Sequence, residues 1–123
     1  TGTLSISGSN TFKTINFYDT TNARTLRFGI GTTTTITDDF NVHGTPSVAY
    51  VSIESGTAGT QFTLSKASGV VNDMDIVNVK DSVATGGASW YAGANSVNVS
   101  NNTGWIFTDA PAASTTDKFF AMF

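Results

Sequence analysis

Three segments of the chain share one pattern: residues 15–19 (INFYD), 40–44 (FNVHG) and 77–81 (VNVKD). In each, two apolar residues flank an Asn, a polar or amphipathic residue follows, and Asp or Gly then turns the chain. The first two segments are 25 residues apart and the last two are 37 apart. A unit that recurs at intervals of about 20–50 residues is typical of repeat architectures.

A second strand supports the same interval. An offset of 25 residues carries Leu26 and Phe28 onto Val51 and Ile53. A third set of strands follows in each turn with looser spacing: residues 34–36 (TTI), 62–64 (FTL) and 105–107 (WIF). We therefore predict an all-β fold, a right-handed parallel β-helix (β-solenoid) of about three turns with three short strands per turn.

Alternation within the strands predicts an apolar interior and two polar rows outside. The residues expected to point inward are Ile15, Phe17, Phe40, Val42, Val77 and Val79. An outer ladder of amides, about 4.8 Å apart, is expected to contain Asn16, Asn41 and Asn78. A second outer row is expected to contain Tyr18, His43 and Lys80.

The last turn contains extra residues. Residues 82–104 are rich in Gly, Ala, Asn and Ser, and they are expected to form a projecting loop, because insertions on one face of a solenoid often supply its binding surface. The solenoid domain would span residues 1–108. Residues 109–123 would form a linker and an apolar C-terminal cap or docking tail, with Phe119, Phe120, Met122 and Phe123 available for assembly.

An antiparallel β-sandwich is the alternative fold, because it also uses many short alternating strands with frequent turns. The repeated Asn triplet favours the solenoid, since a sandwich fold does not require the same strand pattern to recur at a fixed interval. The chain begins at Thr1 without a secretory signal, so it reads as a processed or excised piece of a longer protein.

Composition excludes several classes of function. Only 12% of the residues are charged, against about 25% in an ordinary domain. Six basic residues and a formal net charge of −3 give no surface for a phosphate backbone, so we expect no nucleic acid partner. No apolar run approaches the roughly 20 residues of a membrane span, so we expect no membrane insertion. The absence of Cys excludes disulfides, thiolate nucleophiles and Cys-based zinc sites.

Catalytic patterns are weak. His43 is the only histidine, and no Gly-x-Ser-x-Gly elbow is present. A glycosidase would need two carboxylates, and an acid on a shallow outer strand has little to raise its pKa. The acidic residues that could supply such a pair are Asp38, Asp39, Glu54, Asp73, Asp75 and Asp81. We therefore predict that the chain is not an enzyme.

A calcium ion is the one cofactor that the sequence allows. Residues 72–75 (NDMD) place oxygen ligands close together, as hard cations require. Asp73 and Asp75 would need a further ligand such as Asp39 from the turn below. The full order of ligands in an EF-hand loop is missing, so a solvated turn is the favoured interpretation and we expect no cofactor, with calcium as the alternative.

Aromatic side chains are the stronger functional signal, because flat rings beside amides suit the faces and edges of sugars. Trp90 and Tyr91 lie in the predicted loop and cannot both point inward, whereas Trp105 and Phe107 match core positions. The candidate ligand-binding residues are Trp90, Tyr91, Asn95, Tyr18, His43 and Lys80.

The stretches 59–70 (GTQFTLSKASGV), 77–82, 84–92 (ATGGASWYA) and 95–107 resemble a segment that recurs in β-helical surface proteins of bacteria and in phage tail-fibre and appendage proteins. The resemblance implies a virion or extracellular, cell-surface setting and attachment to a host-cell surface glycan or receptor. Homo-oligomers, trimers above all, are an implication of the family. No catalytic residues come with it.

Together these observations predict a structural and surface-recognition module of a fibre. A purely structural shaft or virion decoration module that assembles through its ends is the alternative, and a polysaccharide-degrading enzyme is a third.

Overall fold

A computed structural model describes residues 2–111 of the chain. The first of its three sheets has the strand order β1 (Gly2–Ile6), β3 (Arg24–Phe28), β5 (Val51–Ser55), β8 (Val77–Lys80) and β11 (Val97–Ser100). The second has the order β2 (Asn10–Tyr18), β4 (Thr33–His43), β6 (Phe62–Ser65) and β9 (Ser82–Thr85). The third contains β7 (Val70–Val71), β10 (Ser89–Tyr91) and β12 (Trp105–Ile106), with β10 in the middle.

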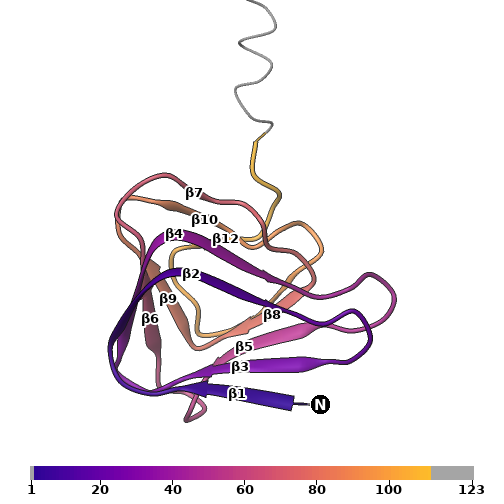
Figure 1. Cartoon of the computed structure of the whole chain (residues 1–123), viewed down its shortest axis with the longest axis horizontal. Coiled ribbons are helices and arrows are strands. Elements are labelled where there is room, and N and C mark those ends of the chain that lie inside the picture. Colours follow the sequence, from indigo (N-terminus) through magenta and orange to yellow (C-terminus); the bar gives the residue numbers. More distant parts are fainter. Residues whose placement is uncertain (1, 112–123) are drawn as a thin grey trace, which may run out of the picture.

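The chain is a parallel β-solenoid of about four turns. Every strand pairs in parallel with its equivalent in the next turn, so the antiparallel sandwich is wrong. Viewed with the N-terminal turn in front, the chain runs clockwise as it recedes (Figure 1). The coil is therefore right-handed, as parallel crossover connections are. Residues 2–111 contain no helix that could cross a membrane.

The two long strands β2 and β4 each cover two faces of the coil. The register between them shifts between Phe12 and Thr14, where β4 contains one residue more than β2. A bulge of this kind bends a strand. The part of β4 before the bulge pairs with β6. The part after the bulge ends at His43, which forms a β-bridge with Asp75 on the face that carries β7. The later halves of β2 and β4 thus lie beside β7, β10 and β12 (Figure 1).

Inward side chains from all turns form one apolar core. Phe28 stacks on Phe62 with ring centroids 4.7 Å apart, and Trp90 meets Phe40 edge to face at 5.7 Å. Each fully buried side chain of this size contributes about 1.5–3 kcal/mol by leaving water. The largest fully buried side chains are Trp90, Phe28, Phe40, Phe62, Leu26, Ile36, Ile53, Leu64, Val42, Val51, Val77 and Val79.

The predicted 25-residue offset is confirmed on the face formed by β2 and β4. Asn16 pairs with Asn41 and Phe17 with Val42. The amide Nδ2 of Asn41 donates a hydrogen bond of 2.8 Å to Oδ1 of Asn16. The outer amide ladder therefore exists between these two turns.

In the first sheet the predicted register is wrong by two residues. Leu26 pairs with Ile53 and Arg24 with Val51, which is an offset of 27. The chain between His43 and Val51 is two residues longer than the chain between Tyr18 and Arg24. An even shift leaves the same side chains facing inward, and Leu26, Phe28, Val51 and Ile53 are all buried.

The third Asn triplet was assigned to the wrong face. Val77, Asn78 and Val79 pair with Val51, Ser52 and Ile53 in the first sheet. Asn78 therefore does not continue the ladder, and Lys80 does not extend the row of Tyr18 and His43. The apolar-Asn-apolar pattern reports only that one strand face is buried, and any face of the coil can carry it.

The projecting loop predicted for residues 82–104 is also wrong. This stretch forms β9, β10 and β11, which is the greater part of another turn, so the coil has about four turns and not three. Trp105 accordingly pairs with Trp90, and Phe62 with Ser82. Small residues in this turn leave space for the buried ring of Trp90. The tail assigned to assembly, which includes Phe119, Phe120, Met122 and Phe123, lies outside the described residues.

Candidate functional site

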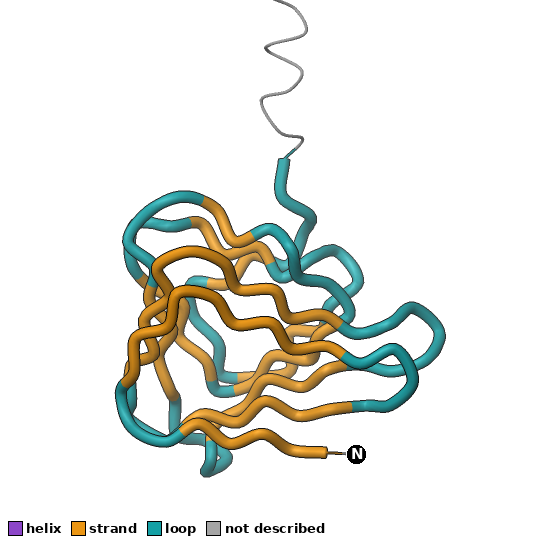
Figure 2. The backbone as a smooth tube through the Cα atoms, in the orientation of Figure 1, coloured by secondary structure: helices purple, strands orange, loops and turns teal. Residues whose placement is uncertain are grey.

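Turns from successive coils meet at one corner, between the face that ends in Tyr18 and His43 and the first sheet. Figure 2 shows these turns as loops that extend beyond the strands on one side of the coil. The turn of residues 44–50 is closed by an antiparallel bridge, in which the N–H of Thr45 donates to the carbonyl of Ala49 at 2.9 Å. Gly44 ties this turn to the next coil by donating to the carbonyl of Asp75 at 3.0 Å.

A pocket of about 310 Å³ opens at this corner, and we call it the corner pocket. Its lining comes from three successive turns of the coil: Pro46, Ser47, Tyr50, Asp75, Ile76 and Asn95. Tyr50 is 41% exposed and offers a flat ring. The pocket thus combines one aromatic ring with a carboxylate and an amide.

Asp75 and Asn95 hold each other in place. The backbone N–H of Asn95 donates to Oδ1 of Asp75 at 2.9 Å, and its amide Nδ2 donates to Oδ2 at 2.9 Å. Both carboxylate oxygens are therefore oriented by one residue of the next turn. Preorganised polar groups of this kind lower the entropic cost of binding a ligand.

Two residues of the corner pocket have strained backbones. Ser47 and Ile76 have φ angles of 61° and 57°, in the left-handed region. For a β-branched residue such as Ile76 this is an outlier, and it costs about 1–2 kcal/mol. Such residues cluster at binding sites, where the surrounding structure holds them in place.

An aromatic stack lies beside the corner pocket. The rings of Tyr18 and His43 are parallel to within 10°, with centroids 4.7 Å apart. His43 pairs with Asp75 through a parallel backbone bridge, so the stack and the pocket lie on neighbouring strands. Asn16 and Asn41 lie two residues earlier on the same outer surface. This surface offers apolar ring faces and hydrogen-bonding amides together.

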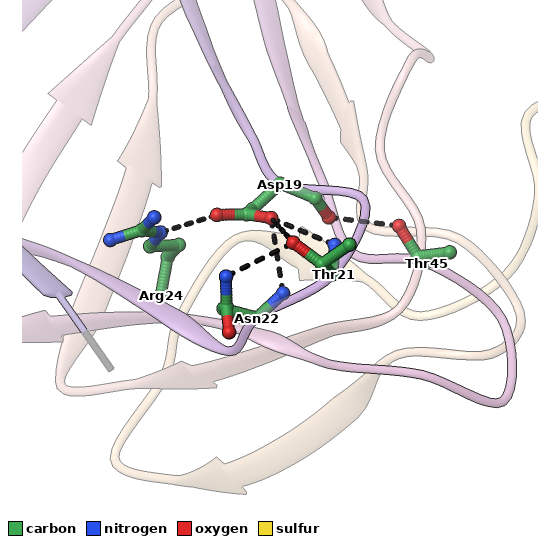
Figure 3. A network of polar contacts seen from close by, with 5 residues as sticks. All are labelled: Asp19, Thr21, Asn22, Arg24 and Thr45. Atoms are coloured by element: carbon green, nitrogen blue, oxygen red, sulfur yellow. Dashed lines mark hydrogen bonds and ion pairs between the residues drawn. The ribbon is translucent and has the colours of Figure 1, made fainter.

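The first turn at this corner is built around Asp19 (Figure 3). Its carboxylate accepts hydrogen bonds from the N–H groups of Thr21 at 2.8 Å and Asn22 at 3.0 Å, and forms an ion pair with Arg24 at 2.6 Å. Its backbone carbonyl accepts from Oγ1 of Thr45 at 2.8 Å, which links this turn to the turn of residues 44–50. The Thr21 N–H first, then Arg24 and the Asn22 N–H, hold the pKa of Asp19 well below its usual range.

The predicted ligand residues do not form one site. Tyr18 and His43 stack on each other at the corner, Asn95 lines the corner pocket, and Tyr91 lies half-buried on the same face. Lys80 belongs to the first sheet, in a shallow depression that Arg27 and Glu54 also line.

The prediction that Trp90 binds a ligand is wrong. Trp90 is 1% exposed, packs against Trp105 with centroids 5.3 Å apart, and donates from Nε1 to the carbonyl of Thr85 at 3.0 Å. It cannot contact a ligand at the surface, because its ring fills the core of the fourth turn.

Sequence reasoning missed Tyr50, Pro46 and Ser47. A signal was available, because the Pro-Ser turn is longer than the corresponding turn one coil earlier and is followed by an aromatic residue. Extra residues in one turn of a regular coil must project from its surface, and their side chains are exposed there.

The candidate calcium ligands are not brought together. Asp39 pairs with Thr14, whereas Asp75 lies opposite His43, which follows Asp39 by four residues on β4. At the rise of a β-strand, four residues separate the two positions by about 13 Å. Within residues 2–111, no group of three acidic or histidine side chains is placed to share a metal ion. Among the residues that line the corner pocket, Asp75 is the one carboxylate.

The sequence matches no known family model, and no curated protein or solved structure is significantly similar to the chain.

Proposed function

We propose that the chain is a structural and surface-recognition module of a phage tail fibre or another extracellular fibre, and that it binds carbohydrate on a host-cell surface. The observation that carries this proposal is the corner pocket, in which Tyr50, Asp75 and Asn95 converge beside the stacked rings of Tyr18 and His43.

The chemistry of the pocket suits a sugar ring. A pyranose has an apolar face of C–H groups and an edge of hydroxyl groups. Exposed aromatic rings pack against such a face, while carboxylates and amides bind the hydroxyl edge. Asp75 and Asn95 are already fixed by their mutual hydrogen bonds, so little side-chain entropy is lost on binding.

The scaffold suits a fibre. Each turn of a solenoid contacts its neighbours along the axis, which gives a stiff rod on which turn residues project from one side. The surface is built mainly from Thr, Ser, Asn and Gly, with only 12% charged residues in the chain.

Binding to an immobilised glycan array tests the proposal. Tyr50→Ala and Asn95→Ala each remove one side of the pocket and are expected to weaken binding by at least about tenfold, the value of one charge-assisted hydrogen bond or one aromatic contact. Lys80→Ala is the matched control, because Lys80 lies on a different sheet, and it is expected to bind like the parent chain. Unchanged binding in both pocket variants would contradict the proposal.

Assembly with further copies of this chain is a second candidate function, and the N-terminal end of the coil favours it. The outer edge of β1 has no partner strand within the described residues. Leu4 is 49% exposed there, beside a pocket of about 370 Å³ that Phe17 also lines. At the other end, Asn102 donates to Asn98 at 2.8 Å and to the carbonyl of Val79 at 2.7 Å.

The mass of the chain in solution tests this second function. If copies associate through the N-terminal end, Leu4→Lys lowers the mass to that of a monomer and leaves glycan binding intact. Val48→Lys is the control, since Val48 is equally exposed, at 56%, but lies in the corner turn. A parent chain that is monomeric at high concentration would exclude this function.

A further inference from the structure

The corner pocket also indicates which sugars it accepts, an inference that rests on the proposed function. We propose that the pocket selects neutral saccharides through their hydroxyl donors and rejects acidic ones.

The charged hydrogen-bonding group of the pocket is an acceptor. Each oxygen of Asp75 already accepts one bond from Asn95 and keeps a lone pair for a ligand. The hydroxyl groups of Ser47 and Tyr50 and the second N–H of the Asn95 amide can donate to a ligand. A ligand that binds Asp75 itself must bring a donor, and the hydroxyl groups on one edge of a sugar supply such donors.

The charge of the pocket points in the same direction. No Lys or Arg is among the described residues that line it. The nearby guanidinium of Arg24 is paired with Asp19 at 2.6 Å. A uronic acid or sialic acid would place its carboxylate against Asp75, where both groups accept hydrogen bonds and repel each other. Specificity against such a ligand follows from that repulsion.

Tyr50 sets the orientation of the sugar. This residue comes from a different turn of the coil from Asp75 and Asn95 and lines the same pocket. A sugar that packs its C–H face on this ring would present its hydroxyl edge to the carboxylate. The discrimination therefore depends on the polar edge and not on the aromatic contact.

Calorimetric titration of the parent chain with matched pairs tests this inference. The probes are the methyl glycosides of glucose, galactose and mannose, each compared at pH 7 with the corresponding uronic acid. The parent chain is expected to bind the neutral member of at least one pair, and the acidic member at least about tenfold more weakly, since a lost charge-assisted bond has that value. Asp75→Asn is expected to reduce that ratio severalfold.

The outcomes separate the two proposals. Binding of an acid as tight as its neutral partner, and lost in Tyr50→Ala, would overturn the selectivity while the pocket remains a sugar site. Binding of no member of any pair would overturn the selectivity and the proposed function together. The comparison on the parent chain does not depend on how well Asp75→Asn folds.

Discussion

Asn41 donates a hydrogen bond of 2.8 Å to Asn16, a residue 25 positions earlier in the chain, across two parallel strands of neighbouring turns. The bond fixes the register of the coil on the face that leads to the corner pocket. Because an error of one residue would turn every side chain to the opposite face, this register also decides that Tyr18 stacks on His43.

Replacement of Asn41 by Ala removes this bond and is expected to lower the free energy of unfolding by about 0.5–1.5 kcal/mol, the usual net value of a side-chain hydrogen bond. Asn78→Ala is the matched control. Asn78 carries the same sequence pattern but lies beside Ser52, so its loss is expected to change stability by less than about 0.5 kcal/mol. Urea denaturation followed by circular dichroism measures both. Equal effects of the two substitutions would contradict the register.

Trp90→Ala is expected to destabilise the fold by about 3–5 kcal/mol, because it leaves a large cavity and removes a buried indole hydrogen bond. The neighbouring substitution Tyr91→Ala is expected to cost less than about 1 kcal/mol, since Tyr91 is only half-buried on the outer side. Equilibrium unfolding compares them. If Trp90→Ala were the milder change, residues 82–104 would form a projecting loop after all.

Gly86 lies in a tight corner of the coil, with a φ angle of 92° and only 2.0 Å between an added Cβ and the carbonyl oxygen of Lys66. Gly86→Ala is therefore expected to cost several kcal/mol, from the left-handed backbone and from the backbone clash. Gly31 has a similar φ of 66° but open space around it, so Gly31→Ala is expected to cost only about 1–2 kcal/mol. Thermal unfolding distinguishes the two effects, and a Gly86→Ala variant as stable as Gly31→Ala would show that the turns do not stack so closely.

The network around Asp19 predicts a dependence of stability on pH. Because folding lowers the pKa of this carboxyl, its contribution is complete above the unfolded value of about 3.9 and is lost as pH falls toward the folded value. Asp19→Asn should therefore be less stable than the parent chain at pH 7, and the difference should shrink below about pH 4. Urea midpoints at pH 7, 5 and 3 measure this, and a constant difference across the series would mean that the ionised carboxylate is not the cause.

Asp81 is expected to act in the same direction. Burial alone would raise the pKa of this carboxyl, but the Gly59 N–H, the Asn101 amide and the charge of Lys80 outweigh burial and lower it. Part of the acid sensitivity should therefore persist in Asp19→Asn.

The parallel coil was predictable because β2 and β4 repeat the apolar-Asn-apolar pattern in register, with Asn16 opposite Asn41 at an offset of 25. The two-residue extension of the turn at residues 44–50 was enough to displace the register of the next strand, and no pattern within the strand itself reports such a shift. The shift is an even number of residues, so the same side chains of this strand face inward although their partners differ from the predicted ones.

The last turn was harder to predict, because small residues occupy some inward positions that are large in the turn before, and a large residue occupies a position that is smaller there. Ala84 and Ala92 point inward beside Trp90, so the apolar alternation that identifies a buried strand is weak in sequence. For the same reason an interior tryptophan was assigned to the surface. The corner pocket could not be predicted as a unit, since Tyr50, Asp75 and Asn95 meet only after the register of three turns is known. Asp75 and Asn95 were each identified, but for different sites.

Mapping of amide chemical shifts during titration with a neutral methyl glycoside tests the central claim most directly. The proposed site predicts that the largest shifts occur at Tyr50, Asp75 and Asn95, with smaller ones at His43, and that the amides of Arg27 and Lys80 on the first sheet stay unchanged. Shifts centred on the first sheet, or no shift at the corner at saturating sugar, would contradict it.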